Sequence, residues 1–175
     1  MSETDAARRP ASRTLGDLVD EMAGRSPTAE AVVFGDQRLD YAGVKTQVDA
    51  VARALLAAGV RRGDRVALLV TNRPEWMVCA LAIGKIGAIV AAISTFSTPR
   101  ELAWALQHSG AVALVTLDAF RGRRFVDALR ELCPALDHAT PGALRCAALP
   151  SLRSVVIVGD SVPAGAYSFS GFMAT

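Results

Sequence analysis

Residues 66–93 read VALLVTNRPEWMVCALAIGKIGAIVAAI and contain one complete β–α–β unit. Residues 66–70 form an apolar run of strand length, and Pro74 stands where a helix begins, because proline is favoured at the first helical position. This helix is expected to end at Lys85, and the apolar, β-branched run 88–93 follows it as a second strand. Uniformly apolar strands joined by a helix are typical of parallel strands that are covered on both faces.

Part of this stretch has to be weighed as a membrane span. Residues 77–93 are nearly all apolar, which is about the lower length limit for a transmembrane helix. Lys85 lies at the centre of the run, where a charged side chain costs about 2.5–3.5 kcal/mol in a bilayer. Gly84 and Gly87 also divide the run into a helix-like half and a β-branched half. A buried helix followed by a buried strand is therefore favoured.

The same alternation extends on both sides of this unit. Asp40 can cap one long helix, and Thr98 with Glu101 forms the capping box of another. The expected helices are 14–24, 41–58, 74–85, 98–109 and 120–132, and the expected strands are 31–34, 37–39, 66–70, 88–93, 112–115 and 155–158. This order predicts an α/β fold with βαβ units on a parallel sheet and helices on both faces.

The ends of the chain differ from its middle. Residues 1–13 are polar and are expected to form a flexible leader, and residues 14–160 are expected to form the domain. Residues 161–175 place Tyr167 and Phe172 on a Gly- and Ser-rich stretch without periodicity, which we interpret as a truncated apolar tail.

Composition narrows the classes of function. The chain has 175 residues, of which 51% are hydrophobic, so it is not intrinsically disordered. A net charge of +2 gives no electrostatic case for a nucleic acid or an anionic membrane as partner. The three cysteines and two histidines lack the spacing of a zinc site, so no metal is expected. With no secretion signal and no disulfide pattern, the expected location is cytoplasmic.

One basic cluster could carry chemistry. Residues 121–124, Arg-Gly-Arg-Arg, follow the expected strand 112–115 and so lie near the carboxyl edge of the sheet, where α/β folds bind ligands. Guanidinium groups there could hold a phosphate, or the cluster could be the solvated first turn of a helix. We find no glycine-rich phosphate-binding loop and no nucleophile elbow in the sequence.

Several short motifs occur in an order that resembles one family. Residues 38–41 look like a Leu-Thr-Tyr motif, with Asp40 in place of Thr. Four longer stretches match family patterns: 55–67 (aLxxxGvxxGDrVa), 72–76 (NxxE[FW]), 82–90 (AxxKxGAxV) and 100–111 (xELxxxLxxSxA). From about residue 14 to 160, the chain is similar to the N-terminal portion of AMP-forming acyl-CoA synthetases of the adenylate-forming superfamily.

The resemblance implies a function for a longer protein. Members of the family join a carboxylic acid to ATP, with Mg²⁺, and then to coenzyme A (CoA). It implies CoA contacts at Arg121 and Arg124 and a CoA path along Ser94, Thr95 and Phe96, with no catalytic residue in this chain. The family's phosphate loop and catalytic lysine are absent, so we expect an inactive fragment whose missing C-terminal part is its partner.

Two other hypotheses remain open at this stage. The chain could be a non-catalytic module that binds a partner through its apolar tail. It could also be a fragment of an amino-acid-activating adenylation domain, which belongs to the same superfamily.

Overall fold

The computed structural model describes residues 14–175, and the predicted leader lies outside the described residues. Its centre is a sheet of five parallel strands, β3 (Arg65–Leu69), β4 (Ile89–Ala92), β5 (Ala113–Leu117), β8 (Ser154–Val158) and β9 (Tyr167–Ser168). Their order in the sheet is β4-β3-β5-β8-β9. Every residue of β5 and β8 is buried, which accounts for sequences that are apolar apart from Thr116 and Ser154.

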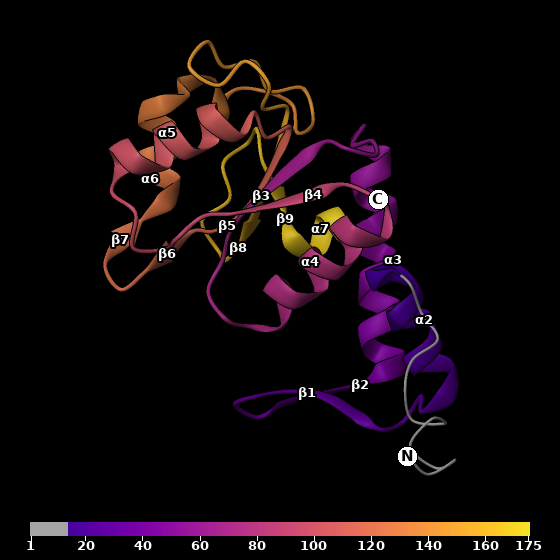
Figure 1. The fold of residues 1–175 in the computed structure, drawn as a ribbon. Coiled ribbons are helices and arrows are strands. Elements are labelled where there is room, and N and C mark those ends of the chain that lie inside the picture. Colours follow the sequence, from indigo (N-terminus) through magenta and orange to yellow (C-terminus); the bar gives the residue numbers. More distant parts are fainter. Residues whose placement is uncertain (1–13) are drawn as a thin grey trace.

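Helices cover both faces of this sheet, which confirms the predicted fold class (Figure 1). On one side lie α3 (Tyr41–Ala57), α4 (Pro74–Lys85) and α7 (Phe169–Met173), with α2 (Leu15–Arg25) against α3 and α4. On the other side lie α5 (Pro99–Ser109) and α6 (Phe125–Leu132). A short 3-10 helix, η1 (Pro134–Asp137), follows α6. The antiparallel hairpin β1 (Glu30–Phe34) and β2 (Gln37–Asp40) lies apart from the sheet.

Local sequence signals explain most of the helix ends. Thr98 accepts the N–H of Glu101, and the Glu101 side chain accepts the N–H of Thr98, so the predicted capping box is present. Asp40 caps α3 through the N–H of Gly43, at 2.7 Å. Gly59 follows α3 with φ of 85°, in the left-handed conformation that glycine adopts without strain.

The apolar run 77–93 is divided as predicted, because α4 ends at Lys85 and β4 begins at Ile89. Within residues 14–175, no helix has both the length and the apolar character needed to cross a bilayer.

Two predicted elements differ from the structure. A helix was expected from residue 120, but α6 begins at Phe125, after a small hairpin of β6 (Ala119–Phe120) and β7 (Arg123–Arg124). Its turn residues, Arg121 and Gly122, both have positive φ, which a right-handed helix excludes.

No strand or helix was expected in the apolar tail, residues 161–175, but Tyr167–Ser168 pair with β8, and the Phe172 side chain of α7 is buried. The rings of Tyr167 and Phe172 lie 5.2 Å apart.

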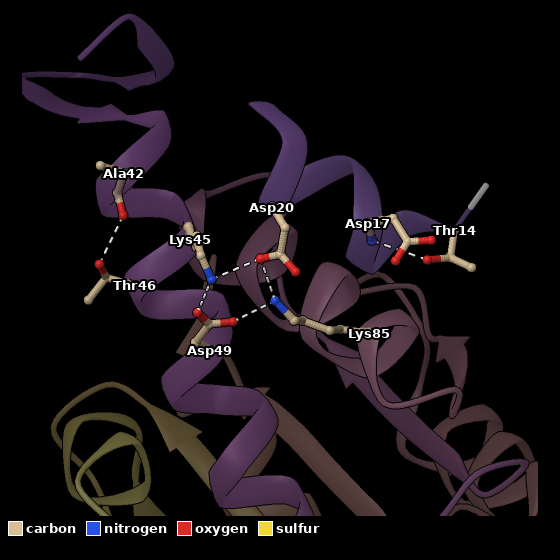
Figure 2. Close-up of polar contacts among 8 residues, drawn as sticks. All are labelled: Thr14, Asp17, Asp20, Ala42, Lys45, Thr46, Asp49 and Lys85. Carbon is tan, nitrogen blue, oxygen red and sulfur yellow. Dashed lines mark hydrogen bonds and ion pairs between the residues drawn. The ribbon is translucent and has the colours of Figure 1, made fainter. Parts of the chain in front are cut away.

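The two lysines of the chain, Lys45 and Lys85, meet two carboxylates where α2, α3 and α4 converge (Figure 2). Lys85 Nζ lies 2.7 Å from both Asp20 Oδ1 and Asp49 Oδ1. Lys45 Nζ contacts the same two side chains. Each charge therefore faces two of opposite sign. Gly16 makes this approach possible, because a Cβ there would lie 2.9 Å from Lys85 Cγ.

This cluster makes the stability of the fold depend on pH. Hydrogen bonds from Lys45 and Lys85 lower the pKa of Asp20. Burial acts to raise the pKa of Asp49, but hydrogen bonds from the same lysines outweigh it and lower that pKa. A carboxyl with a lowered native pKa stabilises the fold above its unfolded pKa, about 3.9, and loses that contribution as the pH falls through the native value.

We expect the double variant Asp20→Asn/Asp49→Asn to lower the free energy of unfolding at pH 7 by about 1 kcal/mol, a modest value because all four groups are partly exposed. The difference from the unmodified chain should shrink as the pH falls below about 4, measured by urea unfolding across pH. Asp36→Asn, in the exposed β1–β2 turn, is the control and should change little. An equal difference at pH 3 and pH 7 would contradict the electrostatic account.

Candidate functional site

The order of the strands creates a place for a ligand. The chain passes from β3 to β4 on one side and then crosses to β5 on the other side of β3. In open α/β sheets, ligands bind beyond the carboxyl ends of the strands at such a reversal. The segments that follow β3, β4 and β5 all emerge at this edge.

A cavity of about 480 Å³ lies at that edge. Its walls come from the segments after β3 and β4, from α4, and from the β6–β7 hairpin. Three aromatic side chains line it, together with five polar ones: Trp76, Phe96 and Phe120, and Thr71, Asn72, Ser94, Thr95 and Arg121. Aromatic walls with a few polar groups and one cation suit an organic ligand that carries a negative charge.

Of the five residues that the resemblance implies, four line this cavity, namely Ser94, Thr95, Phe96 and Arg121. Thr95 is buried, whereas Phe96 is 61% exposed at the rim. Arg121 lies in the hairpin turn with φ of 48°, and its guanidinium carbon is 5.3 Å from the centre of the Phe120 ring. No carboxylate pairs with Arg121 among residues 14–175, so its charge is available to an anion.

Arg124 does not line the cavity. Its Nε donates a hydrogen bond to Asp127 Oδ2 at 2.5 Å, and this bond lowers the pKa of Asp127. Its side chain is 60% exposed. Any phosphate that it binds has to compete with Asp127.

Sequence reasoning missed the contribution of the other cavity residues. Thr71 and Asn72 follow strand β3 after one residue, Val70, and a polar pair near the carboxyl end of a parallel strand is a signal that could have indicated them. Phe120 carried no such signal, because its position depends on a hairpin that the sequence did not predict.

Asp118 organises the neighbouring loop. Its carboxylate accepts N–H groups from Ala119, Asp160 and Ser161 at 2.7–3.3 Å, and so joins the ends of β5 and β8. Partial burial acts to raise the pKa of Asp118, but these backbone donors outweigh it and lower the pKa.

No group of three or more metal-ligating side chains occurs within the described residues.

Comparison with known proteins places the chain in a family. Residues 19–170 match the family model described as AMP-binding enzyme. The chain is 34% identical over 154 residues to the mitochondrial medium-chain acyl-CoA ligase ACSF2 of Bos taurus, covering 87% of this chain and 25% of that protein. It is 33% identical over 156 residues to YngI of Bacillus subtilis, which carries a provisional acyl-CoA synthetase name, covering 88% and 28%.

A solved structure has the same fold. The anthranilate CoA ligase AuaEII, in complex with anthranoyl-AMP, superposes with a TM-score of 0.76 at 24% identity, covering 99% of this chain and 30% of that one.

The chain therefore belongs to the AMP-binding enzymes, the adenylate-forming ligases, and matches the N-terminal portion of such enzymes. The two curated relatives named above carry acyl-CoA synthetase or acyl-CoA ligase names. It spans about a quarter of the length of the curated relatives that it matches.

The loop that Asp118 holds should tolerate no side chain at Gly159, where φ is 150° and a Cβ would lie 2.3 Å from Asp118 Cγ. We expect Gly159→Ala to lower the free energy of unfolding by about 2 kcal/mol, because it displaces the carboxylate from its donors. Urea unfolding measures this. Gly24→Ala in α2, with nothing within 4 Å, is the matched control and should be neutral or slightly stabilising. Equal stability of Gly159→Ala and the unmodified chain would refute the account.

Proposed function

We propose that this chain forms the CoA-binding edge of an AMP-forming acyl-CoA ligase that acts on a fatty or related carboxylic acid. The observation that carries the proposal is the free guanidinium of Arg121 beside an aromatic cavity at the reversal of the strand order. The acyl-CoA ligase names of the two relatives support this class over an interaction module or an amino-acid-activating domain.

The proposed reaction has two steps. The carboxylate of the acid attacks the α-phosphate of ATP, which forms an acyl-adenylate and releases pyrophosphate. The thiol of CoA then attacks the acyl carbon, which forms the thioester and releases AMP. The first step needs cations and N–H donors around the phosphates, and the sequence contains no phosphate loop that would supply them.

The residues of this chain would act on CoA. Its phosphates carry charge that Arg121 can bind through the planar guanidinium, and its adenine offers an aromatic face to Trp76 or Phe96. The buried Thr95 lies in the segment that would line the path toward the reacting carbon. The role of Arg124 is weaker because Asp127 already engages its side chain.

We expect Arg121→Ala to weaken CoA binding by about tenfold and Arg124→Ala by about twofold, since only the first removes an unpaired charge. Isothermal titration of CoA into the purified chain measures both. Arg53→Ala, on the remote helix α3, changes the net charge equally and should leave the affinity unchanged. Equal CoA binding by the Arg121→Ala/Arg124→Ala pair and the unmodified chain would remove these residues from the site.

We expect the chain alone to catalyse no acid-dependent exchange of pyrophosphate into ATP, because the groups that stabilise charge on the reacting phosphate are not in its sequence. Radiolabelled pyrophosphate with medium-chain fatty acids tests this, and full-length bovine ACSF2 serves as the positive control. A robust exchange signal from the chain would disprove the claim that it is inactive by itself.

A further inference from the structure

Arg123 joins two walls of the cavity. Its Nη1 donates hydrogen bonds to the carbonyl oxygens of Phe96, at 2.7 Å, and Ser97, at 2.9 Å. Arg123 belongs to the β6–β7 hairpin, which brings Phe120 and Arg121 to the cavity. Phe96 ends the segment 94–96, which forms the facing wall.

The two walls have little else that joins them. Within residues 14–175, no other hydrogen bond runs between the segment 94–97 and the hairpin. The segment itself is held by a local turn, in which Ser97 N–H donates to Ser94 O at 3.0 Å and Phe96 N–H donates to Ser94 Oγ at 3.2 Å. Phe96 is the most exposed aromatic wall, so packing does not fix its position. The hairpin has only two residue pairs and also needs an external anchor.

The positive charge of Arg123 is tolerated beside the N-terminus of α5 because the carboxylate of Glu101 lies near it. Arg123 approaches the N-terminal turn of α5, whose partial positive charge is unfavourable for a guanidinium. Glu101 lies in that turn and is fixed by Thr98, whose N–H and hydroxyl donate to its carboxylate at 2.7 and 2.9 Å. The charge of Glu101 thus offsets that of the helix end. The two hydrogen bonds from Arg123 therefore form a tether between the segment 94–97 and the hairpin.

We propose that Arg123 is a positioning residue of the cavity, which holds the segment 94–97 against the hairpin and so sets the distance between Phe96 and Arg121. This inference rests on the proposed function for the identity of its ligand, CoA. With the tether, the wall is ordered before the ligand arrives. Without it, the ligand has to order the segment, and fixing the backbone of even one or two residues costs enough to weaken binding by about tenfold.

The test separates the geometry of the cavity from its ligand. The chain has two tryptophans, and Trp76 lines the cavity whereas Trp104 is exposed and stacked on His108. In a Trp104→Phe background, the tryptophan fluorescence comes from Trp76 alone. We expect Arg123→Ala to increase the quenching of Trp76 by acrylamide and to raise the dissociation constant for CoA about tenfold. Arg123→Lys keeps a cationic donor and should restore part of both signals.

Arg145→Ala is the matched control. Arg145 is exposed, and within the described part of the chain its side chain donates only to the carbonyl of its neighbour Leu144. It lies on a loop that does not line the cavity, so both readouts should stay unchanged. Circular dichroism checks folding, and where Arg123→Ala fails to fold, Arg123→Gln, which loses the charge and the reach, replaces it with the same expected changes.

The two failures are distinguishable. If Arg123→Ala, or Arg123→Gln in its place, leaves both the quenching of Trp76 and the CoA affinity unchanged, the positioning role is overturned. If the unmodified chain binds no CoA, the proposed function is overturned, and the quenching of Trp76 still decides whether Arg123 holds the wall.

Discussion

The reversal of the strand order at β3 is the constraint on which the site depends. All five strands run in the same direction, so the segments that leave them emerge at one edge. Strand β4 pairs on one side of β3, and β5 pairs on the other. The connecting helices α4 and α5 therefore have to lie on opposite faces of the sheet. The segments after β3 and β5 therefore diverge, and the cavity occupies the space between them.

The sequence was sufficient to predict most of this framework. Strands β3, β5 and β8 are apolar apart from Arg65, Thr116 and Ser154, which follows from burial on both faces. The helix starts at Asp40 and Thr98 could be predicted because each side chain accepts a hydrogen bond from a backbone N–H three residues later. Such signals act within four residues, so they can be recognised without any knowledge of the tertiary structure.

Interactions between distant or very short segments could not be predicted in this way. β6, β7 and β9 have two residues each, which is too few for a period to be recognised. Residues 161–175 showed no periodicity in the sequence, because their structure comes from pairing with β8 and from the burial of Phe172. The resemblance to a family indicated Arg121 and Thr95, but the tether from Arg123 spans 26 and 27 residues and has no counterpart in a local pattern.

The cluster that holds Lys45 and Lys85 has a practical consequence for the chemical modification of this protein. These two are the only side-chain amines in the sequence, and both lie in one cluster of alternating charge. Hydrogen bonds to Asp20 and Asp49 raise the pKa of Lys45, so the unprotonated amine that attacks an acylating reagent is scarce while the cluster is intact. Acylation of these two side chains, read separately from that of the chain's N-terminal amine, would therefore report how often the cluster opens, while the arginine-lined edge of the sheet stays unmodified.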